Sequence, residues 1–195
     1  MSGRWPLLVA LSSCALLVSV YATMAIAIMP MVIIDLGAPP AIMQVGAYGY
    51  LLAFLGALIP APRRQRVLLI VSIALGLVAF GLATVLWILS PMPSLLVGGR
   101  LLQALAGAVV LWAGTGLVRA AFPGPELWKA ILIPAGVAVV GLLAGLLIGL
   151  IVTELFSWRV TFLLGLPLVA VALVAVLIAA VKPPAAVPDH RLPAR

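Results

Sequence analysis

Long uncharged stretches separate the few ionisable side chains, and this feature limits the fold more than any other. A helix needs about 20 largely apolar residues to cross the hydrocarbon core of a bilayer. Reading each stretch as a crossing, and dividing one of them at the breaker Ser90-Pro91-Met92-Pro93-Ser94, predicts six transmembrane helices over 7–34, 41–60, 67–89, 95–118, 130–152 and 160–181. Only 8% of the residues are charged, against roughly 25% in soluble domains, which excludes a soluble globular fold.

The basic residues predict the orientation of these helices. With a cytoplasmic N-terminus, nine of the eleven basic residues fall on the cytoplasmic side: Arg4, Arg63, Arg64, Arg66, Arg119, Lys129, Lys182, Arg191 and Arg195. Because cytoplasmic loops carry an excess of Lys and Arg, both termini are predicted to be cytoplasmic. The chain is then one six-helix domain over 1–181 with a short, Pro-rich, basic tail over 182–195. The net charge of +7 therefore reports topology, and no nucleic-acid partner is expected.

Several function classes lack the residues that they need. The sequence has one cysteine, Cys14, and no His, Cys and carboxylate spacing typical of a metal site, so neither a metal nor a cofactor is expected. No phosphate-binding glycine loop or nucleophile with a nearby base is present, which argues against an enzyme. Asp35 and Glu154 fall at the outer ends of spans, so no acidic residue is available for a proton relay in the span interiors.

Small residues mark a packing surface on the fifth predicted span. Gly141, Gly145 and Gly149 repeat every four residues and therefore form one stripe along the helix. Such stripes allow close approach of helix backbones in lipid. Two interpretations remain open: a static packing seam, or a seam on which two helices slide during a transport cycle.

Arg100 is the most informative ionisable residue. A guanidinium at the bilayer centre costs at least about 2.5 kcal/mol, so an intramembrane arginine is functional by default. Gln103 and Gly107 lie three and seven positions further on and share its helix face. The alternative is that Arg100 lies near the outer edge and extends its side chain to the headgroups.

Other polar and aromatic side chains in the spans have ordinary structural explanations. Thr side chains such as Thr84 usually bond to their own helix, and Tyr near an interface, such as Tyr48 or Tyr50, usually acts as an anchor. Four tryptophans fall near predicted helix ends, as expected for an aromatic belt: Trp5, Trp87, Trp128 and Trp158.

Four stretches resemble motifs of one transporter family in their order along the chain. Val97 to Ala108 resembles the fourth-helix motif built on R-x-x-Q-G-x-G-A, and Gly145 to Leu150 resembles the antiporter motif G-P-x-x-G-G. Trp158 to Phe162 is similar to W-R-W-x-F, while Thr23 and Pro30 match the first-helix motif D-x-T-I-V-N-V-A-L-P. Together they resemble the N-terminal half of a major facilitator superfamily transporter of the drug:proton antiporter branch, from about Tyr21 to Ala180.

This resemblance implies an all-α half bundle with a three-plus-three repeat. By this resemblance Arg100 would face the central cavity and assist coupling, and the stripe of Gly145 and Gly149 would form a bending, closely packed fifth helix. The candidate site residues are then Arg100, Gln103, Thr23 and Tyr21 for coupling or transport, Gly107, Gly141, Gly145 and Gly149 for helix packing, and Arg63, Arg64 and Arg66 for a cytoplasmic gate loop. Tyr21 replaces the first-helix Asp of the family, Leu146 the motif Pro and Leu150 the last Gly. The gate loop also lacks the family's Asp and glycines.

We therefore expect a half-size transporter in the bacterial inner (plasma) membrane. It would export hydrophobic or amphipathic small molecules, as a homodimer or with a partner half, because alternating access requires two bodies that rock. The alternative is a structural or accessory subunit of a larger membrane complex that has no transport activity.

Overall fold

A computed structural model describes residues 4–62, 65–122 and 124–181, and every regular element in these ranges is a helix. Within the described ranges, five helices are long and apolar enough to cross a membrane: α1 (Trp5–Leu36), α4 (Arg66–Leu89), α5 (Pro93–Ala121), α6 (Glu126–Leu155) and α7 (Trp158–Val181). Each of them contains one of the predicted spans. Proline stands at the start of α5, where its missing N–H removes no helical hydrogen bond.

The predicted span over 41–60 is interrupted. It consists of α2 (Pro40–Gly49), α3 (Leu52–Leu55) and the 3-10 turn η1 (Gly56–Leu58), so the expectation of one continuous helix is wrong here. Glycines lower helix stability by about 1 kcal/mol each in water, and Gly46, Gly49 and Gly56 fall within this short segment. A side chain at Gly56 would overlap the backbone of Ala108 in α5.

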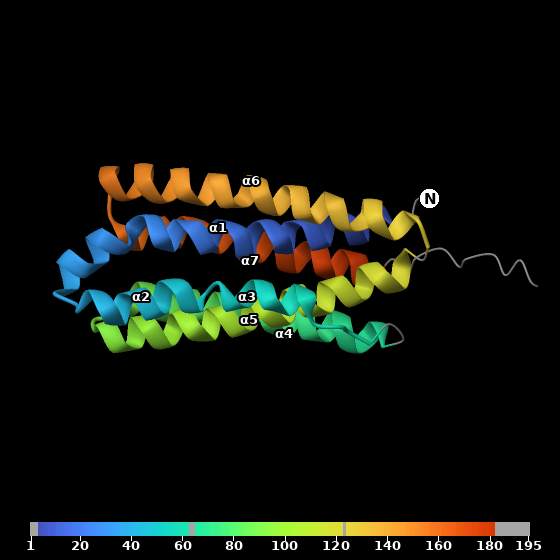
Figure 1. The fold of residues 1–195 in the computed structure, drawn as a ribbon, viewed down its shortest axis with the longest axis horizontal. Helices are drawn as coiled ribbons and strands as arrows, with labels where there is room; N and C mark the ends of the chain where they lie inside the picture. Colours follow the sequence, from blue (N-terminus) through green and yellow to red (C-terminus); the bar gives the residue numbers. More distant parts are fainter. Residues whose placement is uncertain (1–3, 63–64, 123, 182–195) are drawn as a thin grey trace, which may run out of the picture.

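The helices form an elongated bundle with α1 at its centre (Figure 1). Helix α1 packs against α6 on one side and α7 on another, while α4 packs against both α5 and α7. The interrupted segment α2, α3 and η1 lies along α5. The beginning of α1 and the end of α7 lie at the same end of the bundle (Figure 1).

Ion pairs join neighbouring helices at both ends. Arg4 Nη1 donates to Glu126 Oε2 over 2.7 Å and joins the start of α1 to the start of α6. At the opposite end Arg159 Nη1 donates to Asp35 Oδ2 over 3.1 Å, and Trp158 Nε1 donates to the same oxygen over 2.9 Å. These contacts join the end of α1 to the start of α7.

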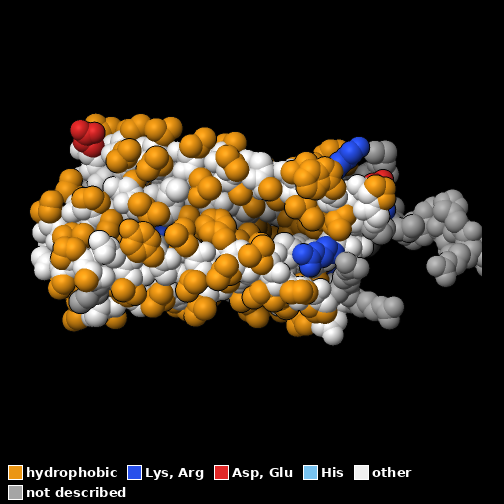
Figure 2. Space-filling model, in the orientation of Figure 1, with side chains coloured by type: hydrophobic (Ala, Val, Ile, Leu, Met, Phe, Trp, Pro, Cys, Tyr) orange, Lys and Arg blue, Asp and Glu red, His pale blue; other side chains and the backbone are white. Residues whose placement is uncertain are grey.

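Apolar side chains cover the outside of the bundle as well as its core. Figure 2 shows hydrophobic side chains over the whole visible face, with the larger basic patches near the end where the chain begins. Helix α6 alone exposes Val140, Leu143, Leu147 and Ile151. Because helices that are apolar all round are typical of membrane spans, this surface suits contact with lipid.

The four tryptophans of the predicted aromatic belt divide into two groups. Trp5 and Trp128 are 57% and 66% exposed, as expected for an interfacial belt, but Trp87 and Trp158 are buried. The ring centroids of these two lie 6.1 Å apart, and the Trp87 ring lies 4.4 Å from that of Phe162. The belt interpretation is therefore wrong for Trp87 and Trp158, whose rings fill the space between α4 and α7.

Candidate functional site

The glycine stripe of α6 lies directly against the backbone of α1. Gly141, Gly145 and Gly149 are all buried there. A Cβ on Gly141 would approach the Leu16 carbonyl oxygen to 3.0 Å, and one on Gly145 would overlap the Val20 carbonyl. The absence of side chains on α6 is therefore what allows these two helices to pack so closely.

Thr23 belongs to this seam. Its hydroxyl donates a 2.6 Å hydrogen bond to the Leu142 carbonyl oxygen of α6. Its Oγ1 is also one of the atoms that a Cβ at Gly145 would meet. Thr23 therefore lies on the face of α1 that packs against α6, whereas the Arg100 side chain contacts a different face of α1.

Arg100 lies in the interior of the bundle. The residue is fully buried, and it follows the start of α5 by seven positions. Its Nη2 donates to the Tyr21 carbonyl oxygen at 2.7 Å and to that of Ala22 at 3.4 Å, and its Nη1 donates to Gln103 Oε1. Both carbonyls are in the middle of α1, so the guanidinium points inward and does not extend to the headgroup region.

A short hydrogen-bond chain continues from Arg100 into α4. The Gln103 amide nitrogen donates to Thr84 Oγ1 over 2.8 Å, and the Thr84 hydroxyl donates to the Phe80 carbonyl over 2.9 Å. Gln103 and Thr84 are both fully buried. These hydrogen bonds satisfy polar groups that would each cost several kcal/mol if left unpaired in hydrocarbon.

Aromatic rings complete the surroundings of the guanidinium. The Arg100 Cζ lies 3.7 Å from the centroid of the Tyr50 ring and 6.0 Å from that of Trp87. Such cation–π contacts contribute about 2 kcal/mol or more when desolvated. Hydroxyl groups hold the rings in place, since Tyr50 donates to Val18 O over 3.0 Å and Tyr21 to Phe162 O over 3.2 Å.

We call this group the arginine cluster, and it consists of Tyr21, Tyr50, Thr84, Trp87, Arg100 and Gln103. It joins α1, α4 and α5 to Tyr50, which lies between α2 and α3, and Tyr21 extends it to α7. No carboxylate pairs with Arg100 among the described residues, where the two ion pairs lie at the ends of the bundle. Carbonyl and amide oxygens and ring faces stabilise the positive charge instead. Arg100 Nε has no hydrogen-bond partner within the described ranges.

Sequence reasoning did not place three members of the cluster near Arg100. Tyr50 and Thr84 were explained as ordinary structural residues, and Trp87 as part of a belt. A signal existed for the last two, because Phe80, Thr84 and Trp87 are spaced by four and three residues and so share one face of α4. That face is the buried one.

The remaining predicted site residues are separate from the cluster. Gly107 lies where α5 approaches α1 and α3, since a Cβ on it would meet Ala53 Cβ at 3.3 Å and Val18 Cγ1 at 3.5 Å. Of the gate-loop residues, Arg63 and Arg64 lie outside the described residues. Arg66 begins α4, and its Nη2 donates to the Ala179 carbonyl oxygen of α7 over 3.1 Å.

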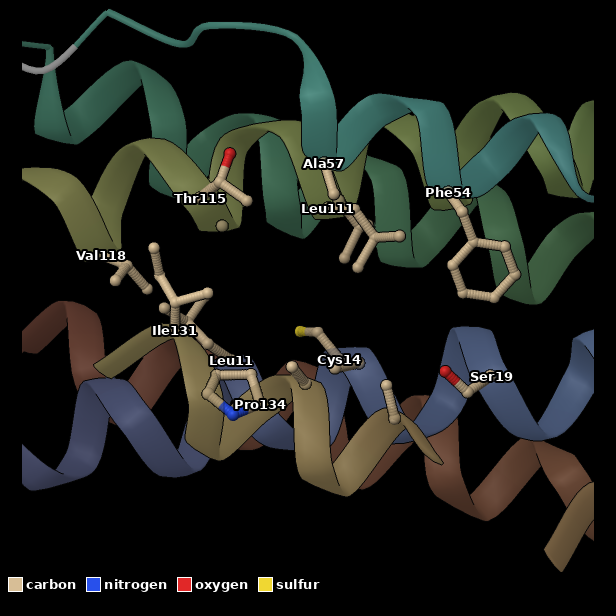
Figure 3. A pocket seen from close by; sticks show the side chains of 15 residues that line it. Leu11, Cys14, Ser19, Phe54, Ala57, Leu111, Thr115, Val118, Ile131 and Pro134 are labelled. Atoms are coloured by element: carbon tan, nitrogen blue, oxygen red, sulfur yellow. The ribbon is translucent and has the colours of Figure 1, made fainter. Parts of the chain in front are cut away.

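A cavity of about 190 Å³ opens between two helix pairs, α1 with α6 on one side and the α3–η1 segment with α5 on the other (Figure 3). Its lining is almost entirely apolar, and no charged side chain in the described part of the chain contributes to it. The Ser19 hydroxyl is buried without a hydrogen-bond partner in the described part of the chain. The lining residues are Leu11, Cys14, Ala15, Ser19, Phe54, Ala57, Val110, Leu111, Gly114, Thr115, Val118, Ile131, Pro134, Ala135 and Ala138.

Comparison with known proteins identifies relatives over most of the chain. The cephamycin export protein CmcT of Amycolatopsis lactamdurans is 36% identical over 148 residues, covering 72% of this chain and 29% of the relative. The tetracenomycin C resistance and export protein of Streptomyces glaucescens is 32% identical over 184 residues, which is 90% of this chain and 33% of the relative. The riboflavin transporter RibZ of Clostridioides difficile (strain 630) is 34% identical over 98 residues, 50% of this chain and 22% of the relative.

The chain spans about a third or less of the length of these relatives. The sequence profile described as Major Facilitator Superfamily matches residues 11–194. With five apolar helices and bacterial relatives, the chain is a multi-pass protein of the bacterial plasma membrane. It belongs to the Major Facilitator Superfamily, a family of membrane transporters, and resembles its drug-exporting members.

Proposed function

We propose that the chain forms one half of an exporter for neutral hydrophobic or amphipathic small molecules. The observation that supports this most is the apolar cavity between α1, α3, η1, α5 and α6. Binding sites for small molecules are typically apolar clefts with a few polar groups. Because no charged side chain of residues 4–62, 65–122 or 124–181 lines the cavity, it favours uncharged substrates, and the Ser19 hydroxyl offers a polar contact.

The small volume of the cavity supports the presence of a second six-helix half. Sites for drug-sized ligands usually enclose roughly 300–1,000 Å³, whereas this one measures about 190 Å³. A second six-helix bundle facing it would supply the opposite wall and the second body that alternating access requires. That bundle is another copy of this chain, a partner subunit or a further part of the same polypeptide.

We further propose six crossings with both ends of the helical region cytoplasmic. The interrupted segment from Pro40 to Leu58 has 19 residues and runs along α5, so at a helical rise it extends about 28 Å, close to the hydrocarbon thickness. The end of the bundle that carries Arg4, Arg66, Arg119 and Lys129 would then face the cytoplasm, as the positive-inside rule requires.

The arginine cluster has a positioning role in this proposal. Arg100, Gln103 and Tyr21 hold α1, α4 and α5 together, so that this half moves as one body. Thr23 contributes at a different place, because it holds α1 against the glycine stripe of α6.

One observation favours the alternative, a membrane subunit without transport activity. Within the described residues, Asp35, Glu126 and Glu154 all lie at helix ends, so no acidic group occupies the interior where proton coupling usually takes place. Such a subunit would purify in fixed stoichiometry with a larger complex and would show no flux of its own.

Transport in vesicles tests the proposal. The protein is purified from membranes together with any partner, its composition is determined by native mass spectrometry, and the assembly is reconstituted with a neutral lipophilic fluorophore and a lipophilic cation. We expect flux of the neutral compound to exceed that of the cation. Absence of flux under every applied gradient, with the assembly intact, would contradict the exporter and support the accessory subunit.

A pair of tryptophan variants links flux to the cavity. Ala138 lines the cavity on α6, so Ala138→Trp should fill it and lower flux at least tenfold. Ala170 is an exposed alanine on α7 away from the cavity, and Ala170→Trp should leave flux unchanged. Equal flux in the two variants would show that the substrate does not pass through this cavity.

A further inference from the structure

Two further hollows lie along the seam between α1 and α6, and they share no lining residue with the cavity described above. A groove of about 220 Å³ runs along the seam, and a pocket of about 330 Å³ adjoins it at the end where both helices begin. Trp5, Leu8 and Ile133 line both of them. The two hollows therefore adjoin and form one depression, with an outer part at the start of both helices and an inner part further along them.

The two parts differ in chemistry. The groove is lined mainly by apolar side chains, among them Val9, Leu16 and Val137. The outer pocket contains Arg4, Lys129 and Glu126 next to the rings of Trp5 and Phe122. A charged pocket that leads directly into an apolar groove matches a molecule with an ionic head and a hydrocarbon tail.

The charged side chains of the outer pocket indicate whether the ionic head of the ligand is positive or negative. Arg4 is already paired with Glu126 at 2.7 Å, and its guanidinium lies 5.4 Å from the Phe122 ring centroid. The exposed Lys129 has no carboxylate within 4 Å among the described residues. The pocket thus offers one uncompensated ammonium group, which favours an anionic ligand.

We propose that this depression binds one anionic phospholipid, with its phosphate beside Lys129 and an acyl chain in the groove between α1 and α6. The site lies at the strongly basic end of the bundle, where the charge pattern places the cytoplasmic leaflet. Basic pockets between transmembrane helices on that side are suited to anionic headgroups. The continuity of pocket and groove selects a lipid over a soluble phosphate, because only a lipid fills both parts.

Native mass spectrometry with defined lipids tests the site. The purified protein is titrated with phosphatidylglycerol and with phosphatidylcholine of the same acyl chains, and glycerol 3-phosphate serves as a headgroup without a tail. We expect tighter binding of phosphatidylglycerol and no competition by glycerol 3-phosphate. Equal retention of the two lipids would overturn the proposal, and competition by glycerol 3-phosphate would show that a soluble anion occupies the pocket.

Three variants locate the binding. Lys129→Gln should weaken phosphatidylglycerol binding about fivefold, the effect of one basic residue near an anionic surface. Arg119→Gln removes a cation at the same end of the bundle but outside the depression, and should have no effect. Glu126→Gln frees Arg4 and should strengthen binding. Equal affinities of Lys129→Gln and Arg119→Gln, in protein that keeps its helical circular dichroism, would refute the assignment.

Discussion

The contact between α1 and the glycine stripe of α6 allows a sharp test of the packing. Adding one methyl group at Gly145 would overlap the Val20 carbonyl and bring the new carbon to about 2.5 Å from Thr23 Oγ1. The obstacle is backbone, which cannot rotate away as a flexible side chain would. Helix α6 must therefore move outward, and the hydrogen bond from Thr23 to Leu142 is lost with the contact.

The magnitude follows from these contacts. Overpacking a tight interface by one carbon typically costs 1–3 kcal/mol, and an interhelical hydrogen bond in a membrane contributes about 0.6 kcal/mol. Alanine is also the better helix former in water by about 1 kcal/mol, which offsets part of the loss. We expect Gly145→Ala to lower the free energy of unfolding by about 0.6–2.6 kcal/mol.

Gly136 provides the matched control on the same helix. No heavy atom of the described residues lies within 4 Å of a Cβ at this position, so Gly136→Ala makes the same chemical change without a steric conflict. It should leave stability unchanged or raise it by up to about 1 kcal/mol. Both variants are compared by reversible unfolding in mixed detergent and SDS micelles, followed by circular dichroism. Equal stabilities of the two variants would refute the close-packing argument.

Three further predictions concern buried polar groups, and the same unfolding assay measures each. Arg100→Ala should lower the free energy of unfolding by about 2–5 kcal/mol through the cavity it leaves. The double variant Arg100→Met with Gln103→Met leaves neither polar group unpaired and should recover most of this loss. Absence of any recovery would contradict the role of these paired polar groups. Tyr50→Phe keeps the ring under Arg100 and should lower the free energy of unfolding by only about 0.6 kcal/mol, whereas Tyr50→Leu should lower it by about 2 kcal/mol more. Similar losses in the two variants would exclude a cation–π contribution. Thr153 and Thr161 share a hydrogen bond of 2.9 Å, so a double-mutant cycle with valine should give a coupling of about 0.6 kcal/mol, and zero coupling would show that the bond contributes nothing.

The long helices could be predicted from charge and hydropathy, since each of the five contains one predicted span. The interrupted segment could not, because hydropathy is the same for a continuous and a broken apolar helix. The 3-10 turn η1 begins at Gly56, which lies against the Ala108 backbone of α5, and this contact joins residues far apart in the sequence.

The arginine cluster was only partly predictable. The spacing of three between Arg100 and Gln103 places both on one face of α5, and the two residues are hydrogen-bonded. Tyr21 and Thr23 were grouped with them, but residues two apart lie on nearly opposite faces of a helix. Accordingly Tyr21 belongs to the Arg100 side of α1, and Thr23 to the α6 side.

By itself the sequence determined that the chain folds in lipid, where its five long described helices lie and which face of α6 can pack closely. These properties follow from the spacing of charges, prolines and glycines along a single chain. Only the tertiary structure decided that the Arg100 guanidinium is held by backbone carbonyls of α1 and the ring of Tyr50. Every helix carries the same backbone carbonyls, so no residue type in the sequence marks which of them receives a buried charge.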